Sequence, residues 1–574
     1  MFFIRHCYPY RHKIFLCSFL LILTVVSELL LPFYMGKAVD FGIVKKDTDA
    51  LFYYGGQILL YASVLAISSL WVNGILSCVM SSFSADLRTN LFKKIQLFSP
   101  YEMELFSVDS LVVRTTNDIT QIQDFLANSL RILLTAPLFC FGGFFLIIRK
   151  SLPLSFIILF AAVPIMGLIL GIIRLMRPYI RKEQVLLDHV NQVFRENLTG
   201  MFMLRAFRLE KWQENRFEKV SGQYKKVQLF MEKCFAGIYP GVVFIFNITS
   251  LLILGIGSHQ VIGGTLSEGD LMAFLQYSGI VLMSFVNISQ IINQAPRMAI
   301  CMKRISEILE TTPQISDPCE SESTTSPMRI NSISFQDVTF SYPKSSQPAL
   351  ENLSFTAKKG ETIAIMGATG SGKSTIMALL MRFYDPQKGN IQINGIGIKS
   401  LPLKKLRGYI SYVPQKTLLF SGTVKSNFEM ANPTVSTEEI FHALNVSQAD
   451  AFILERSNQL MEKVERGGKN YSGGQKQRLS IARALVRDSQ IYLFDDSFSA
   501  LDYKTDKKIR EKLAQRCKNS IVLISTQRIE TAKQADKILV LEHGRLAGFD
   551  THENLFCQCQ AYQAIVNSQQ SSSS

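Results

Sequence analysis

A glycine-rich stretch in the second half of the chain carries the residues best suited to chemistry. Residues 367–375 read GATGSGKST and fit the pattern G-x-x-x-x-G-K-[ST]. An apolar run over 362–366 predicts a strand before this loop, and the run over 376–380 predicts a helix after it. Glycines let backbone N–H groups surround phosphate oxygens, and a helix N-terminus adds partial positive charge. The stretch therefore predicts a binding site for a nucleoside triphosphate.

The same region predicts which groups bind ATP and Mg²⁺. Lys373 is expected to reach the outer phosphates, and the Ser374 hydroxyl is expected to bind Mg²⁺. A second apolar run, 491–494, ends on Asp495, the strand-end carboxylate that supports the Mg²⁺ shell in P-loop ATPases. The ATP-binding residues predicted here are Gly367, Ala368, Thr369, Gly370, Ser371, Gly372, Lys373, Ser374, Thr375 and Asp495.

Composition predicts that the site belongs to a membrane protein. Of 574 residues 48% are hydrophobic and only 19% are charged, and long uncharged runs fill the first half. A helix that crosses a bilayer needs about 20 mostly apolar residues. Six stretches satisfy this requirement: 14–34, 58–80, 130–148, 154–175, 241–262 and 271–292. They predict an all-α transmembrane domain of six helices in the plasma membrane.

The positive charge is interpreted as a topology signal. A net charge of +15 is compatible with nucleic-acid binding, but much of the Lys and Arg excess flanks apolar runs, as the positive-inside bias produces. We therefore predict no nucleic-acid partner. The basic N-terminus and the polar segments 81–128 and 177–233 are expected in the cytoplasm. The two segments predict long helical extensions between spans two and three and between spans four and five.

The pattern changes after the sixth span. Residues 311–327 are rich in Pro, Ser, Thr and acidic side chains, which predicts a linker. Beyond it, β-type runs such as 332–340, 409–413 and 521–525 alternate with helical segments and predict an α/β domain with a mainly parallel sheet. The predicted organisation is a transmembrane domain 1–310, a linker 311–329, an ATP-binding domain 330–566 and a disordered tail 567–574.

Further motifs resemble those of ATP-binding-cassette (ABC) proteins. They are the signature (Ser472, Gly473, Gly474, Gln475), the Q-loop (Gln415) and the D-loop (Ser499, Asp502). Tyr342 stands where the family stacks an aromatic ring on adenine. Six spans, two helical extensions and one C-terminal cassette resemble an ABC half-transporter of the exporter type over nearly the whole chain.

The resemblance implies a dimeric, ATP-driven machine. Two half-transporters pair in the bilayer, and each ATP lies between the P-loop of one chain and the signature of the other. Closure of the cassettes drives the spans from inward-facing to outward-facing, with bends near 97–106 and 201–209 transmitting the motion. The resemblance also implies that Ser374, Gln415 and Asp495 hold Mg²⁺.

Two residues depart from the family pattern. Asp496 stands where the family has the Glu that acts as general base, and Gln527 stands where it has His. Gln can donate a hydrogen bond to a phosphate, but it cannot carry positive charge. With Gln415, these are the predicted catalytic positions. Since the signature keeps its Ser and glycines, the chain resembles the degenerate-site half of a bacterial heterodimeric multidrug exporter.

The sequence says less about the transported substrate and about which subunits form the working transporter. Spans three to six are rich in Phe, Leu and Ile, which predicts a hydrophobic or amphipathic substrate of drug or lipid type. Arg174 and His259 are the charged or titratable exceptions in these apolar spans, and each is expected near a membrane interface. Two alternatives fit the same departures: a slowly hydrolysing homodimeric exporter, and an ATP-gated membrane regulator or channel.

Overall fold

The fold was analysed on a computed structural model, which describes residues 8–317, 328–343 and 345–570. Contacts between Cα atoms divide the chain into two compact units. One contains residues 1–96 and 109–311, and the other contains 97–108 and 312–574. Each unit is described by itself. The short segment 97–108, which the sequence analysis included in the transmembrane domain, groups with the cassette.

Six helices of the first unit are long and apolar enough to cross a membrane, counting only the described residues. They contain all six predicted spans. The elements of this unit are α2 (Arg11–Lys37), the π-helical η2 (Ala38–Val44), α3 (Thr48–Gln96), α5 (Val108–Val113), η3 (Arg114–Asp118), α6 (Ile119–Ile148), α7 (Leu152–Thr199), α8 (Met201–Ala206), α9 (Glu210–Ile262) and α10 (Glu268–Glu310). Several helices extend far beyond a membrane's thickness, as the sequence analysis predicted.

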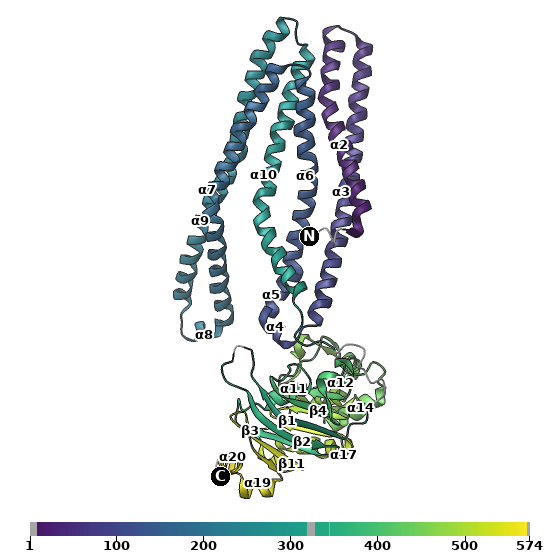
Figure 1. Ribbon diagram of the computed structural model, residues 1–574, viewed down its shortest axis with the longest axis vertical. Coiled ribbons are helices and arrows are strands. Elements are labelled where there is room, and N and C mark those ends of the chain that lie inside the picture. The colour runs from purple at the N-terminus through teal and green to yellow at the C-terminus, as the bar shows by residue number, and fades with distance from the viewer. Residues whose placement is uncertain (1–7, 318–327, 344, 571–574) are drawn as a thin grey trace. The chain divides into compact units, whose positions relative to one another are not determined.

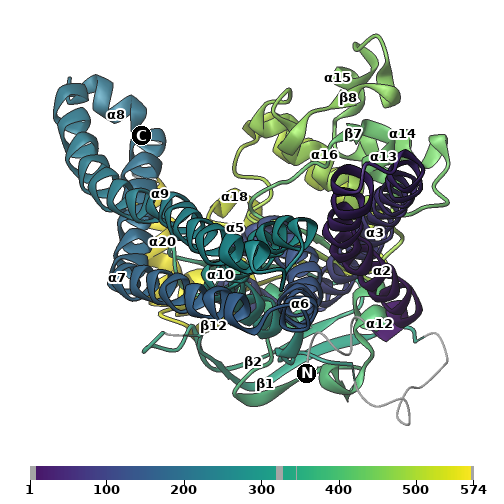
Figure 2. The same cartoon turned by 90° about the horizontal axis from the view of Figure 1, so that it is seen from above.

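The long helices pack in pairs. Helix α7 runs along α9, α2 along α3, and α6 along α10. Figures 1 and 2 show the first two pairs on opposite sides of α6 and α10. Much of the apolar surface of the spans stays open: Phe141 in α6 is 78% exposed and Phe244 in α9 is 67% exposed. Such surface in a soluble protein would be a liability, whereas in a membrane it faces lipid or another helix.

The first and last spans are joined by a close backbone contact. A Cβ atom on Gly36 would lie 2.7 Å from the carbonyl oxygen of Gly269. Asp40, one turn later, accepts hydrogen bonds from the Ser267 hydroxyl (2.6 Å) and from the Gly269 N–H (2.7 Å). The carboxylate thereby satisfies donors at the start of α10, where a negative charge is favourable. Small residues and a capping carboxylate explain how these helix ends approach so closely.

The second unit is built around two sheets. A six-stranded sheet has the order β12-β11-β3-β10-β9-β6, and a four-stranded antiparallel sheet has the order β2-β1-β4-β5. The mainly parallel sheet was predicted, but the antiparallel sheet was not. The strands are β1 (Ser332–Phe340), β2 (Leu350–Lys358), β3 (Thr362–Gly367), β4 (Lys388–Ile393), β5 (Ile396–Gly397), β6 (Ile410–Val413), β7 (Gly422–Thr423), β8 (Lys463–Val464), β9 (Ile491–Asp495), β10 (Ile521–Ser525), β11 (Lys537–Glu542) and β12 (Arg545–Asp550).

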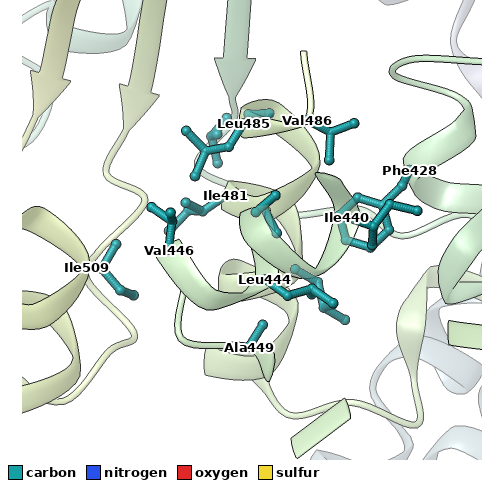
Figure 3. Packing of buried hydrophobic residues seen from close by; sticks show 14 of the residues in the cluster. Phe428, Ile440, Leu444, Val446, Ala449, Ile481, Leu485, Val486 and Ile509 are labelled. Carbon is teal, nitrogen blue, oxygen red and sulfur yellow. The ribbon is translucent and has the colours of Figure 1, made fainter. Parts of the chain in front are cut away.

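Helices complete the cassette and form a second apolar core. They are α4 (Pro100–Phe106), α11 (Lys373–Leu380), α12 (Leu403–Gly408), α13 (Val424–Glu429), α14 (Thr437–Val446), α15 (Asp450–Leu454), α16 (Gly473–Leu485), α17 (Tyr503–Arg516), α18 (Ile529–Ala532), α19 (His552–Gln558) and α20 (Gln560–Gln570). Figure 3 shows side chains from α13, α14, α16 and α17 packed together, among them Phe428, Leu444, Ile481 and Ile509. This core anchors the helix that begins at the signature motif.

The C-terminal segment differs from the predicted boundary, whereas both predicted bends contain a short helix. Helix α20 continues to Gln570, whereas a disordered tail was predicted from residue 567; residues 571–574 lie outside the described part. Short helix α4 lies in the first predicted bend, and its buried Glu102 accepts a hydrogen bond from the N–H of Gln314 in the predicted linker (2.9 Å). This bond ties the bend to the start of the cassette within one compact unit. Helix α8 lies in the second predicted bend.

Candidate ATP-binding site

The site is assembled at the carboxyl ends of four neighbouring strands. Strands β3, β10, β9 and β6 pair in this order and run parallel. The P-loop follows β3, Gln527 follows β10, Asp496 follows β9 and Gln415 follows β6. In open α/β sheets, ligands bind at the carboxyl ends of the strands. Residues up to 160 positions apart therefore meet because of strand order, which the sequence pattern alone does not determine.

Two glycines let the P-loop backbone turn. Gly367 has φ +152° and Gly372 has φ +101°, values that side chains disfavour. A Cβ on Gly372 would also lie 2.6 Å from the carbonyl oxygen of Ala349. The buried hydroxyl of Ser371 has no hydrogen-bond partner among the described residues. A narrow glycine cradle with an unsatisfied buried hydroxyl fits a phosphate-binding loop.

The P-loop lysine, Lys373, is largely buried. Lys373 is 8% exposed, and its Nζ donates to the carbonyl oxygens of Gly367 and Ala368, each at 2.8 Å. Burial lowers the pKa of Lys373, and the carboxylates of Asp496 and Asp495 oppose that shift. The buried Lys373 ammonium group has two carbonyl acceptors among the described residues and is well suited to bind an anionic ligand.

Asp495 is oriented by hydroxyl groups. The Ser374 hydroxyl donates to Asp495 Oδ1 (2.8 Å), and the Tyr412 hydroxyl donates to Oδ2 (3.4 Å). Burial raises the pKa of Asp495, while these hydrogen bonds oppose the rise. A carboxylate and a hydroxyl in contact offer the hard oxygen ligands that Mg²⁺ prefers. The donor set therefore fits the predicted metal position.

One cavity brings the predicted catalytic and phosphate-binding groups together. It has a volume of about 400 Å³, within the range of small-molecule sites. Its lining includes most of the predicted site: Tyr342, Thr369, Gly370, Gly372, Lys373, Ser374, Thr375, Gln415, Asp496 and Gln527. Four predicted ATP-binding residues are not part of this lining: Gly367, Ala368, Ser371 and Asp495.

The two departing residues face this cavity from adjacent strand ends. Gln415 Nε2 donates to Asp496 Oδ2 at 3.4 Å, so the Q-loop and the position of the expected base are in contact. Asp496 has φ +46°, and its N–H donates to the Ser525 carbonyl (3.1 Å). Asp tolerates this left-handed conformation better than most residues. Gln527 is exposed, and its side chain lines the same cavity.

Tyr342 forms a wall of the cavity. Its hydroxyl lies 3.1 Å from Thr375 Oγ1, and its ring packs edge-on against Phe340 and Tyr384. These contacts hold the ring beside the P-loop helix. Stacking on adenine stays a prediction.

The signature residues lie elsewhere on the cassette. Ser472 is the N-cap of α16: its hydroxyl accepts from the Gln475 N–H (3.3 Å), and Gln475 Oε1 accepts from the Ser472 N–H (3.0 Å). Ser472 and Gly473 are exposed, whereas Tyr471 before them is buried under the Arg456 guanidinium. Within the described residues, none of the signature positions lines the ATP cavity.

Sequence reasoning missed the side chains that connect these regions. The Arg528 guanidinium donates to the D-loop carbonyls of Ser499 (2.8 Å) and Leu501 (3.1 Å). Gln477 on α16 accepts from the Ala500 N–H of the same loop (3.2 Å). The other D-loop position, Asp502, caps α17 by accepting from the Thr505 N–H (2.9 Å). The position of Arg528 beside Gln527 was the available signal, but its partners are backbone carbonyls that no motif reveals.

Comparison with known proteins identifies the family. Residues 14–285 match the ABC transporter transmembrane region, and residues 350–499 match the ABC transporter domain. The uncharacterized ABC transporter ATP-binding protein YfiB of Bacillus subtilis is 37% identical over 563 residues, covering 98% of this chain and 97% of that protein. An uncharacterized ABC transporter ATP-binding protein of Mycobacterium tuberculosis is 33% identical over 569 residues, with the same coverages. The chain belongs to the ABC transporter family.

The fold of this ABC transporter also matches a solved exporter. A structure of a bacterial Atm1-family ABC exporter with ATP bound superposes with a TM-score of 0.83, covering 97% of this chain and 98% of that chain. The sequences are 23% identical, so the likeness concerns the fold. The chain is thus an ABC half-transporter with the fold of a solved exporter: an ATPase-coupled membrane protein with one cassette and, among its described residues, six helices able to span a membrane.

Proposed function

We propose that this half-transporter exports hydrophobic or amphipathic molecules of drug or lipid type across the plasma membrane, as the half of a heterodimer whose own ATP site is impaired. The observation that carries the proposal is the pairing of Asp496 and Gln527 in one cavity with an otherwise complete P-loop. ATP-driven export follows from family and fold. We further propose the substrate class, the cytoplasmic position of the cassette and the pairing with a different half-transporter.

The shorter carboxylate weakens the general base. Proton abstraction from a water requires heavy atoms within about 2.6–3.2 Å. Asp496 is one methylene shorter than the Glu of the family and must recover about 1.5 Å, one C–C bond. The contact with Gln415 further engages one carboxylate oxygen. Water activation at this site should therefore be slow.

The replacement of His by Gln removes a second contribution. A histidine can hold a proton and place positive charge near a γ-phosphate, whereas Gln offers only a neutral N–H donor. Gln527 would bind the phosphate without stabilising the charge that develops during transfer. Binding of ATP should persist because Lys373 and the glycine cradle are present.

Mg²⁺ fits the remaining donors. Ser374 and Asp495 would hold it, with Gln415 at the rim of the same cavity. When bound, the ion neutralises charge on the β- and γ-phosphates. The residues of this chain orient the phosphates and exclude water on the buried side of the loop.

Two exposed surfaces of this chain are evidence for pairing with a second subunit. The signature lies outside the ATP cavity of its own cassette, so its exposed Ser472 and Gly473 are available to another chain's nucleotide. Helix α8 leaves Phe202 90% exposed and Met203 66% exposed. Apolar surface of this kind at a chain bend favours burial against a protein partner.

The proposal is tested by ATPase assays on the full chain, alone and with a candidate second half-transporter. Each form is measured with Asp496→Gln and with the matching carboxylate of the other subunit removed. We expect activity only in the pair, abolished by the change in the other subunit and retained after Asp496→Gln.

The opposite result assigns a different function. If the chain alone hydrolyses ATP and Asp496→Gln abolishes that activity, Asp496 is a working base and a homodimeric exporter replaces the heterodimer. If no combination hydrolyses ATP while nucleotide changes ion conductance, the chain is an ATP-gated regulator or channel.

A further inference from the structure

Two charged side chains stand inside predicted membrane spans and have no role in the ATP site. Glu28 lies in α2 and Arg131 lies in α6. Neither residue was among the charged span residues predicted from the sequence, which were Arg174 and His259. Ionisable residues in spans are costly and generally face a water-filled cavity or each other. The position of Glu28 and Arg131 therefore calls for a physical account.

Both residues line one cavity of the membrane unit. The cavity has a volume of about 390 Å³, in the range of ligand sites. Its wall combines polar groups from four helices, including Thr24, Asn73, Asn128 and Asn287, with the apolar side chains of Leu21 and Phe139. A mixed wall of this type suits a molecule with a polar head and an apolar body.

The two charged groups attract each other without a direct contact. In the described part of the chain, neither the Glu28 carboxylate nor the Arg131 guanidinium forms a side-chain hydrogen bond or an ion pair. Charged groups within a membrane span are costly and are usually retained for a function. With no direct hydrogen bond or ion pair to satisfy them, both groups remain available to a ligand.

The pair also lies at a similar distance along the two spans. Glu28 is 16 residues before Val44, where the first span ends, and Arg131 is 17 residues before Ile148, where the third span ends. At a rise of 1.5 Å per residue, both lie about 25 Å from these ends. Because both side chains line the same cavity, one bound head group can face both charges. Arg131 is exposed and Glu28 is half-buried, so the cavity is open on the Arg131 side.

A second cavity continues from the first. It has a volume of about 500 Å³ and shares Asn128 with the cavity just described. Three carboxylates, Asp124, Glu183 and Glu232, and one guanidinium, Arg297, line it. The shared asparagine makes the two cavities neighbours along one polar path.

We propose that Glu28 and Arg131 form a head-group site for zwitterionic amphiphiles, with the carboxylate binding the cationic group and the guanidinium binding the anionic group. This inference rests on the proposed export function and names its substrate class. A simple cation at Glu28 would be repelled by Arg131, and a simple anion at Arg131 would be repelled by Glu28. Only a ligand that carries both charges satisfies both groups at once.

Three dyes with one ring system provide the test: zwitterionic rhodamine B, its cationic ester and anionic fluorescein. Binding is measured by fluorescence anisotropy on the full-length transporter in nonionic dodecyl maltoside, without nucleotide. The wild type should bind the zwitterion about tenfold more tightly than the purely cationic or the purely anionic dye, because a hydrogen bond to a charged group contributes that much.

Each of the two variants should weaken binding of a different pair of dyes, which we call the crossed binding pattern. Glu28→Gln should weaken the zwitterion and the cation about tenfold and leave the anion within about twofold. Arg131→Gln should weaken the zwitterion and the anion and spare the cation. Arg174→Gln removes an exposed charge of α7 outside the cavity and should change none of the three affinities. Equal losses for all dyes, or none, would overturn the inference.

ATP-driven dye uptake into inverted vesicles separates this inference from the function on which it rests. If the zwitterion is exported equally well by wild type, Glu28→Gln and Arg131→Gln, export stands and the head-group site fails. If the crossed binding pattern appears without ATP-driven uptake, the site stands and the proposed export of such molecules fails.

Discussion

The cassette has two surfaces that bear on ATP, and they differ in how far they depart from the family pattern. The P-loop cavity contains both Asp496 and Gln527 in place of the expected Glu and His. The signature surface keeps Ser472, Gly473, Gly474 and Gln475, with only the buried Tyr471 in front of them differing. Change is thus concentrated where this chain would hydrolyse its own nucleotide. The surface that would serve a partner's nucleotide is retained.

The two surfaces are nevertheless mechanically connected. Gln477 on the signature helix contacts the D-loop, and Arg528 next to Gln527 contacts the same loop from the other side. A nucleotide bound in the P-loop cavity can therefore influence the signature through the D-loop without being hydrolysed. If hydrolysis at this site is slow, as we propose, this connection gives a physical reason to retain ATP binding there.

The largest effect should come from Lys373→Ala. Removal of the buried cation should weaken ATP binding at this chain's own P-loop at least about a hundredfold, since charge-assisted contacts to phosphate are lost. Binding of a fluorescent ATP analogue measures this loss. Lys359→Ala, an exposed lysine of the same cassette, should leave the affinity unchanged. Unaltered binding in Lys373→Ala would show that the P-loop is not the nucleotide site.

The next largest effect should come from Gly473→Glu. A Cβ at Gly473 meets no atom within 4 Å, so the cassette should fold normally. The added carboxylate would repel a partner's γ-phosphate, and we expect ATPase activity of the pair to fall about a hundredfold. ATP binding at the P-loop of this chain should persist. Full activity of the pair would contradict a role for this signature.

A gain of function should accompany restoration of the family residues. Asp496→Glu combined with Gln527→His should raise hydrolysis at this chain's own site by about tenfold or more, the lower range for general-base catalysis. The assay uses a pair in which the other site has been disabled. Asp496→Glu alone should give a smaller increase. No gain in the double variant would mean that the slow step lies elsewhere.

The smallest effect should come from Arg528→Lys. A lysine retains the charge but cannot donate to two carbonyls in a fixed geometry, so the D-loop should lose part of its support. We expect the ATPase activity of the pair to fall about threefold to tenfold while ATP affinity at the P-loop stays within about twofold. A fall in affinity with unchanged turnover would place Arg528 in nucleotide binding instead.

Local sequence patterns predicted much of this fold. The six spans, the P-loop between strand and helix, and Asp495 at a strand end were predicted because each depends on neighbouring residues and their periodicity. The antiparallel sheet of β1, β2, β4 and β5 was not, because its pairs join segments whose register depends on distant partners. The helical end of α20 was missed for a related reason, since Gln569 donates to the Gln527 carbonyl (2.5 Å) in a segment 42 residues earlier.

By itself the sequence determined the class of protein, the nucleotide loop and the two departures at Asp496 and Gln527. These depend on residue types at short spacing. Tertiary structure decided which of these residues share a cavity, because strand order places β10 between β3 and β9. It also decided that Glu28 and Arg131, about a hundred residues apart in sequence, line one space. Helix packing, and not spacing along the chain, brings such charges together.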